Sequence, residues 1–194
     1  MTDPYLGRVW GSAERAPEQL ISDLSNKKIV FWFDGRSEVG PRALGHRSIF
    51  GAAETLGLRR KLSEEVKQRE WYRPVAPIVL AEDAAQWFHI SQDIPWMTEA
   101  VVAKSNTLER SPAVVHVDGT SRIQTVRCEQ EPILHDVLTQ YQAATGVPLL
   151  MNTSMNLPNE PICDSPEDAI HTFRGSGADV LYIHGKRYTQ YDLN

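Results

Sequence analysis

The sequence predicts an α/β (α+β) domain in which helices flank one mixed, twisted sheet. Short apolar runs rich in β-branched and aromatic residues alternate with segments of helical periodicity. The strand-like runs are more numerous and are interleaved with the helical segments, which favours one mixed sheet. A chain of 194 residues fits a single domain that can bury a core without disulfides or metals.

The first residues of the chain lack periodicity. We expect residues 1–27 to form a linker-like lead-in that ends in a short helix over 17–25, with Pro17 near its first turn. The folded domain proper is expected to span residues 28–194.

Apolar, β-rich runs predict the strands. The run KIVFWFD is continuously apolar, which is typical of a buried strand. The turn signal DGT is expected to lead into a further strand. In chain order, strands are predicted at residues 28–34, 46–51, 75–80, 99–103, 113–117, 117–126 (after the turn), 147–151 and 179–183.

Periodicity and capping signals predict the helices. Leu58, Leu62 and Val66 recur at helical spacing, Gly146 marks a helix end, and Ser165 is a good N-cap. The expected helices lie at residues 55–69, 82–88, 131–145 and 165–175.

Composition narrows the functional classes. The formal net charge is −5, and proteins that coat nucleic acid through its phosphates are usually basic, so a nucleic-acid partner is disfavoured. The apolar runs are too short to cross a bilayer, and the start MTDPYLGRVW does not resemble a secretory signal. We therefore expect a cytoplasmic protein that does not bind membranes.

The spacing of the cysteines and histidines does not indicate a metal site. Cys128 and Cys163 are far apart, and no CxxC pair occurs, so reduced thiols are expected. The six histidines form no HxxxH or HxH pair, and we expect no metal ligands from the protein.

A turn rich in glycine and arginine follows the first strand. In EVGPRALGHRS, Gly40 and Gly45 allow close backbone approach and Pro41 fixes a bend. Arg42 and Arg47 offer planar donors suited to phosphate or carboxylate. This stretch alone fits an anion-binding turn and a tight turn with solvated arginines equally well. Its spacing is not that of a Walker A loop.

A second polar stretch, KQREWYRP, ends the helix predicted over 55–69. It contains three cations, Lys67, Arg69 and Arg73, which could bind an anion or simply complement the helix dipole. The interleaved Trp71 and Tyr72 are expected in the core rather than stacked on a base.

Two further stretches place polar groups where strands are expected to end. HVDGTSRIQTV supplies Arg122, which alone would more often be a solvated hairpin arginine. PLLMNTSMNLPNEPI places four short polar side chains after an apolar run: Asn152, Thr153, Ser154 and Asn156. This position is favoured for ligands in open sheets, although an ordinary polar turn fits as well.

Together, GRSEVGPRALGHRSI, KQREWYRPVAP, HVDGTSRIQTV and PLLMNTSMNLPNEPI resemble the C-terminal, YrdC-like domain of the O-carbamoyltransferases of antibiotic and nodulation-factor biosynthesis. The resemblance covers residues 28–185. It implies a domain that converts ATP and carbamoyl phosphate into carbamoyl adenylate, releasing pyrophosphate and phosphate. In that family a second domain with bound iron passes the carbamoyl group to a hydroxyl of a small acceptor.

The resemblance also implies residue roles. Arg42 and Lys67 would hold carbamoyl phosphate, and Arg73 would hold phosphates or the developing adenylate. Asn152 and Ser154 would orient the carbamoyl and phosphoryl groups. Cations converging from separate loops are what two anionic substrates require.

Nucleotide contacts are expected from Arg122, Met97 and Arg47, with Mg²⁺ arriving with ATP. Two positions depart from the family pattern: Met155 stands where Phe is usual, and Asn159 where Gly is usual, and Asn tolerates the left-handed conformation.

The transfer domain has no counterpart in these residues, so the resemblance implies a partner protein or a longer chain. Two other functions stay open. One is an adenylate-forming or acyl-transferring enzyme acting on another substrate, and the other is a non-catalytic subunit that binds a nucleotide or RNA.

Overall fold

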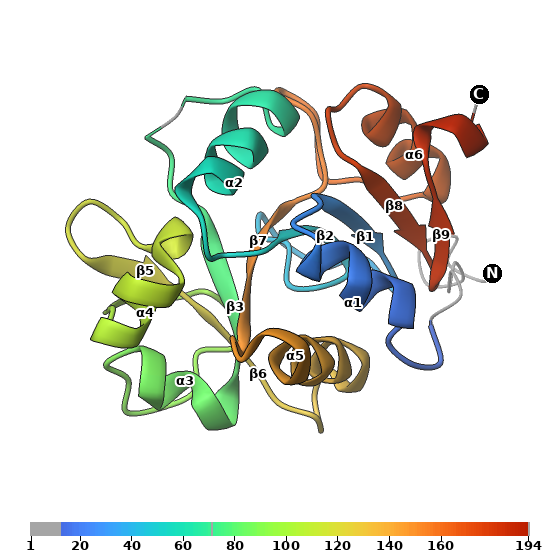
Figure 1. The fold of residues 1–194 in the computed structure, drawn as a ribbon. Helices are drawn as coiled ribbons and strands as arrows, with labels where there is room; N and C mark the ends of the chain where they lie inside the picture. Colours follow the sequence, from blue (N-terminus) through green and yellow to red (C-terminus); the bar gives the residue numbers. More distant parts are fainter. Residues whose placement is uncertain (1–12, 71, 194) are drawn as a thin grey trace.

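The computed structural model describes residues 13–70 and 72–193, and its centre is a mixed sheet (Figure 1). Within the described residues, the seven-stranded sheet has the order β6-β3-β7-β2-β1-β8-β9, and a two-stranded sheet pairs β4 with β5. The pairs β1–β8 and β3–β6 are parallel, and the other pairs are antiparallel. The strands are β1 Val30–Phe33, β2 Arg47–Gly51, β3 Ala76–Leu80, β4 Ala100–Val102, β5 Thr120–Arg122, β6 Gln124–Val126, β7 Leu149–Ser154, β8 Val180–Ile183 and β9 Lys186–Tyr188.

Helices cover both faces of the sheet. Helix α1 packs against α5 and contacts β1, whereas α6 contacts β1 and β8 (Figure 1). The helices are α1 Glu18–Ser25, α2 Leu56–Arg60 with its π-helical continuation Lys61–Val66, α3 Ala81–Trp87, α4 Ser105–Arg110, α5 Pro132–Thr145 and α6 Pro166–Arg174, with 3₁₀ turns at Pro112–Val114 and Gln190–Leu193.

Successive side chains of β1 point to opposite faces of the sheet, so this one strand packs against the helices or strands on both sides. Phe31 packs edge-on against Phe173 of α6, with ring centroids 5.6 Å apart. Its neighbour Trp32 points to the opposite face, where it meets Tyr182 of β8. All four of these rings are buried, so β1 lies at the centre of the hydrophobic core.

Several predictions about single elements are confirmed. Gly146 ends α5 in the left-handed conformation, with φ of 73°. Ser165 caps α6 by accepting a hydrogen bond from the Asp168 backbone, and Asp168 completes a capping box. Helix α1 contributes Leu20 and Leu24 to the core, whereas residues 1–12 of the lead-in predicted over 1–27 lie outside the described residues.

Other elements differ from the prediction. The strand expected over 113–117 is a 3₁₀ turn, because Pro112 starts a helical turn. Helix α4 was not predicted, and neither was β9, which follows a two-residue turn at His184 and Gly185, where both φ angles are positive. The strand expected to end at residue 151 continues to Ser154.

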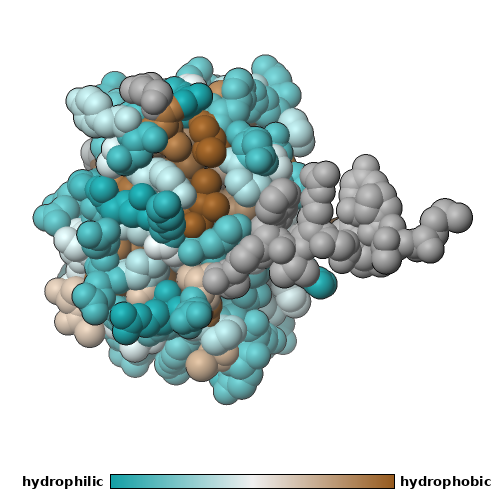
Figure 2. Space-filling model, turned by 90° about the vertical axis from the view of Figure 1, so that its right-hand side faces the viewer, coloured by the Kyte–Doolittle hydropathy of each residue, from teal (hydrophilic) through white to brown (hydrophobic). Residues whose placement is uncertain are grey.

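The face on the right of Figure 1 is shown in Figure 2. Its surface is mostly hydrophilic, with a narrow hydrophobic strip between polar residues. In the part of the chain that the structure describes, no helix is long and apolar enough to cross a bilayer.

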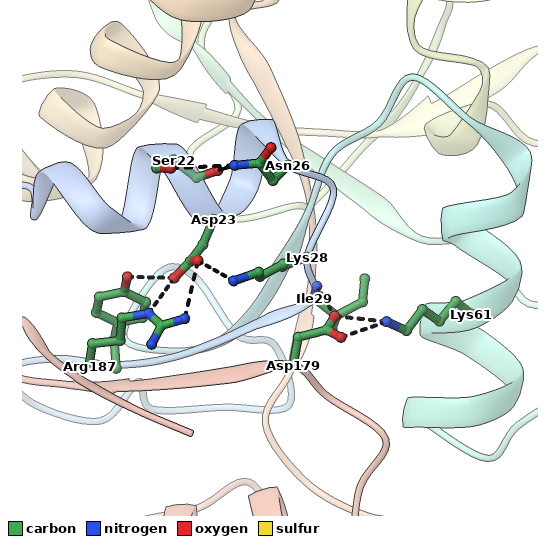
Figure 3. A network of polar contacts seen from close by, with 9 residues as sticks. Ser22, Asp23, Asn26, Lys28, Ile29, Lys61, Asp179 and Arg187 are labelled. Carbon is green, nitrogen blue, oxygen red and sulfur yellow. Dashed lines mark hydrogen bonds and ion pairs between the residues drawn. The ribbon is translucent and has the colours of Figure 1, made fainter. Parts of the chain in front are cut away.

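Two carboxylates, one buried and one partly buried, join distant segments (Figure 3). Asp23 of α1 accepts hydrogen bonds from Arg187 of β9 at 2.8 Å, from Tyr182 at 2.8 Å and from Lys28 at 2.7 Å. Burial would raise the pKa of the Asp23 carboxyl, but these donors outweigh burial and leave the pKa below its usual value.

The second carboxylate, Asp179, immediately precedes β8. It accepts from Lys61 of the π-helix at 2.8 Å and from the backbone amide of Ile29 at 2.7 Å (Figure 3). Together the two carboxylates join α1, the π-helix and the hairpin of β8 and β9 to the central strand.

We predict that Asp23→Ala lowers the free energy of unfolding by about 2–3 kcal/mol at neutral pH, because three donors lose a buried, charged acceptor. Since the pKa of Asp23 is lowered in the folded state, this stabilisation is present above the unfolded-state pKa of about 3.9 and is lost as the pH falls below it. Urea unfolding of both proteins at several pH values measures the difference.

The control is Glu64→Ala, which removes a pair with the exposed Arg60 and should leave stability nearly unchanged. A difference between wild type and Asp23→Ala that stays constant through the acid range would contradict the assignment.

Candidate anion-binding site

Two adjoining cavities lie where the loop after β1, the segment after the π-helix and the end of β7 meet. The large cavity has a volume of about 680 Å³, and the small cavity about 90 Å³. Arg42, Arg69 and Ser154 line both, so the two form one continuous candidate site.

Cationic side chains dominate this site. Arg42, Lys67, Arg69 and Arg73 line the large cavity, and Arg122 of β5 adds a fifth cation in the small cavity. They come from three segments that are distant in sequence, so only the folded chain brings them together. This concentration of positive charge is suited to a polyanion.

The cations are close enough to disturb one another. Burial, followed by the charges of Arg73 and Arg122, lowers the pKa of Arg69. Burial, followed by the charge of Arg42, lowers the pKa of Arg122. Glu70 lines the large cavity and pairs with Arg73 at 2.7 Å.

Some of the cationic donors lack partners. Nε and Nη2 of Arg69 and Nε of Arg122 are buried, and none has a hydrogen-bond partner among the described residues. Buried donors are nearly always paired in folded proteins. An anion in the cavities would supply the missing acceptors.

Lys67 has a different environment. Its ammonium donates to the backbone oxygens of Ser154 at 2.7 Å and Asn156 at 2.6 Å, and to the side-chain oxygen of Asn156 at 2.7 Å. Burial, and after it the charge of Arg69, lowers the pKa of Lys67 to about 7. An ammonium has three donors, and here all three hold the turn after β7 in place.

The π-helix explains how Lys67 and Arg69 reach the same site. The backbone amide of Lys67 donates to the oxygen of Leu62, and Gln68 is left-handed, with φ of 46°. Residues two apart on a regular helix do not face the same side. The wider π turn and the left-handed Gln68 direct both cations toward the large cavity, and such turns are frequent at functional sites.

The glycine-rich loop after β1 is held by a carboxylate. Oε1 of Glu38 accepts from the backbone amides of Leu44 at 2.7 Å, His46 at 2.9 Å and Arg47 at 3.1 Å. Gly45 is left-handed, and a side chain there would collide with Leu134 of α5. The Glu38 carboxylate and the close contact with α5 therefore fix the conformation of the loop.

Arg47 belongs to this scaffold. Its guanidinium donates to the backbone oxygens of Asp34 at 2.9 Å and Gly35 at 3.1 Å, and it lies 3.6 Å from the centre of the Phe33 ring. The side chain is fully buried and lines neither cavity. Its terminal nitrogens are directed to the backbone, and its Nε has no partner among the described residues, so the expected contact of Arg47 with a nucleotide stays a prediction that these two cavities do not support.

The other predicted site residues converge. Arg42 is exposed and lines both cavities, and Ser154 donates to the side-chain oxygen of Asn156 at 2.7 Å. Asn152 and Met97 line the small cavity, where Met97 has a left-handed backbone with φ of 53°. Such a conformation is strained for a non-glycine residue and recurs at functional sites.

Sequence reasoning missed part of this site. It noted Arg69 as a cation without assigning it a role, and it gave no role to Asn156, which lines the large cavity. It expected Tyr72 in the core, but Tyr72 is 63% exposed. Trp71 lies outside the described residues.

The protein's own side chains do not form a metal site in the described ranges, where no group of three or more His, Cys, Asp or Glu residues could hold an ion.

The chain is similar in sequence to known proteins. The chain is 40% identical over 174 residues to the nodulation protein NolNO of Sinorhizobium fredii, covering 88% of this chain and 25% of NolNO. It is 38% identical over 175 residues to the 3'-hydroxymethylcephem-O-carbamoyltransferase of Amycolatopsis lactamdurans, covering 90% of this chain and 33% of that enzyme. The chain thus spans about a quarter to a third of the length of these relatives.

A solved structure supports the fold. Full-length HypF, crystallised in a phosphate- and nucleotide-bound form, matches 84% of this chain and 20% of its own, with a TM-score of 0.57 and 16% identity. This likeness confirms the predicted α/β architecture.

The family described as "Carbamoyltransferase C-terminus" matches residues 21–190, nearly the whole chain. The protein therefore belongs to the carbamoyltransferase C-terminus family.

Proposed function

We propose that this domain forms carbamoyl adenylate from carbamoyl phosphate and ATP. The observation that carries the proposal is the convergence of five cations, two of them with buried unpaired donors, on two adjoining cavities. Two anionic reactants repel each other, and fixed cations offset that repulsion at no cost in reorganisation during the reaction.

The overall chemistry requires two displacements. Water cleaves carbamoyl phosphate to carbamate and phosphate, and a carbamate oxygen then attacks the α-phosphorus of ATP. The new bond joins carbamate to the adenylyl group, and pyrophosphate leaves. The small cavity has the size for the carbamoyl group, and the large cavity has room for phosphates.

Each residue has a role in this proposal. Arg42 and Arg69 line both cavities and would contact both reactants, whereas Arg73 and Arg122 each line one. Lys67 would act mainly by fixing the turn that carries Ser154. This revises the expected direct contact of Lys67 with carbamoyl phosphate, since an incoming ligand would have to displace one of its bonds.

Mg²⁺ would enter with ATP and neutralise part of its charge. Glu70 is the carboxylate that lines the large cavity, and it is already paired with Arg73, so phosphate oxygens and water would supply most of the ligands to Mg²⁺.

Carbamoyl transfer itself would need a further component. The matched part is only 25% and 33% of these two relatives, and one is named as an O-carbamoyltransferase of 3'-hydroxymethylcephem. We infer a transfer domain or partner protein that takes the carbamoyl adenylate and passes its carbamoyl group to a hydroxyl of a small molecule. Dependence on ATP favours a cytoplasmic location.

We predict that Arg42→Ala lowers carbamoyl-phosphate-dependent release of pyrophosphate from ATP by about a hundredfold or more, because the missing cation stabilises transferring phosphoryl oxygens. A coupled pyrophosphate assay measures the rate. The matched control is Arg60→Ala, which removes an exposed arginine that lines neither of the two cavities. Full activity in Arg42→Ala would contradict the assigned site.

We also predict that ATP binding takes up a proton at about pH 8. The pKa of Lys67 is about 7 in the free protein, and a nearby polyanion favours the charged ammonium and raises that pKa. Affinity should accordingly fall as the pH rises through this range.

Calorimetry in buffers of different ionisation enthalpy measures the uptake. The uptake should be absent in Lys67→Met. Equal proton uptake in wild type and Lys67→Met would show that another group titrates.

A further inference from the structure

A buried oxygen in the small cavity has no partner. Oδ1 of Asn152 makes no hydrogen bond within the described residues, although Asn152 is only 2% exposed. The Nδ2 of the same amide donates to the backbone oxygen of Ala43 at 3.0 Å and to Oε1 of Gln124 at 3.4 Å. A buried amide oxygen without a donor is costly, so this one calls for an N–H or O–H from a ligand.

The orientation of this amide is set by the backbone. Gln124, 3% exposed, donates through Nε2 to the backbone oxygen of Leu44 at 2.8 Å, which turns its own Oε1 toward Asn152. The carbonyls of Ala43 and Leu44 are fixed acceptors. Rotating either amide by half a turn would place two oxygens face to face. The unpaired Oδ1 of Asn152 is therefore a consequence of the network.

The sheet register allows the two amides to meet. Asn152 of β7 lies beside Ala76 of β3, and Gln124 of β6 lies beside Ile78 of β3. These side chains share one face of the sheet, because Ala76 and Ile78 are two residues apart. The small side chain of Ala76 leaves space for the two amides to reach each other across β3.

The walls of the small cavity restrict what can approach this oxygen. Ala43, Ala76 and Met97 line it, and its volume is about 90 Å³. A group of only a few heavy atoms fits this volume. The cation Arg122 on the same cavity favours an attached phosphate.

We propose that Gln124 is a positioning residue that, by orienting Asn152, makes the small cavity selective for an acyl phosphate whose acyl group carries an N–H donor. The inference rests on the proposed function. The carbamoyl –NH₂ would donate to Oδ1 of Asn152. The methyl group of acetyl phosphate, which has nearly the same shape, has no donor and would leave this oxygen buried and unpaired. Sites that hydrogen-bond a substrate group reject the analogue that lacks it more strongly than apolar pockets do.

The test compares the dissociation constants of carbamoyl phosphate and acetyl phosphate by calorimetry, in the absence of ATP. We expect wild type to prefer carbamoyl phosphate by about tenfold or more, the range expected for leaving a buried acceptor unpaired. If the wild-type protein binds carbamoyl phosphate and acetyl phosphate with equal affinity, this result alone overturns the inference.

The variant is Gln124→Met, which keeps the length of the side chain but removes one of the two acceptors that hold the Asn152 amide in its orientation, leaving the backbone oxygen of Ala43 as the other. It should weaken carbamoyl phosphate binding about tenfold and change acetyl phosphate binding less than about twofold, so that the preference disappears. A purely structural role would weaken both phosphates alike, and that result would contradict the proposal.

Two further variants complete the design. Gln140→Met on α5 removes a half-buried glutamine that bonds Asp136 and lines neither cavity, so the preference should be unchanged. If Gln124→Met fails to fold, Asn152→Leu removes the oxygen itself and should also abolish the preference. A preference that survives in either site variant would overturn the inference.

The outcomes separate this inference from the proposed function. If the wild type releases pyrophosphate with carbamoyl phosphate but binds both acyl phosphates equally, the proposed function stands and the proposed role of Gln124 is wrong. A wild type that binds neither phosphate contradicts both.

Discussion

The candidate site depends on holding like charges together. Arg42, Lys67, Arg69, Arg73 and Arg122 line two adjoining cavities, and burial together with their neighbours lowers the pKa of three of them. Because like charges repel, a rigid backbone is needed to keep these five cations close together when no anion is bound. The supports of this backbone are the capture of the Lys67 ammonium by three oxygens, the π turn before it, and the Glu38 carboxylate that closes the loop carrying Arg42. Each of them fixes backbone, so that the cations project from parts of the chain that have little freedom to separate.

The loop after β1 shows how one residue type serves two purposes. Arg42 and Arg47 are five positions apart and look equally suited to an anion in sequence. Arg47 is fully buried over Phe33 and gives its donors to backbone oxygens, whereas Arg42 is exposed and borders both cavities. The buried Arg47 joins the ends of β1 and β2, which flank the loop that carries Arg42. A structural arginine thus holds the base of the loop that carries the candidate ligand-binding one.

The sequence predicted those features that depend on local chemistry. The apolar run of β1, the glycine that ends α5 and the cap of α6 each follow from the residues at that point, and the structure has them. The cations and amides of the site were also found, because four separate stretches matched a known pattern together. Features that depend on tertiary context were missed. The residues from Lys61 to Val66 carry no sequence signal for a π-helix. This π-helix nevertheless places Lys67 and Arg69 on the same cavity. The 3₁₀ turn at Pro112–Val114 replaced an expected strand because apolar β-branched residues can also be buried in a turn.

In the proposed reaction, the shared walls of the two cavities would also affect the release of products. The guanidinium groups of Arg42 and Arg69 would face pyrophosphate as closely as they faced the nucleotide from which it came. A rigid cluster of cations attracts leaving and entering anions alike, so departure of the product would oppose the attraction that assembled the reactants. Net conversion in the forward direction would then depend on how quickly other enzymes of the cell hydrolyse free pyrophosphate.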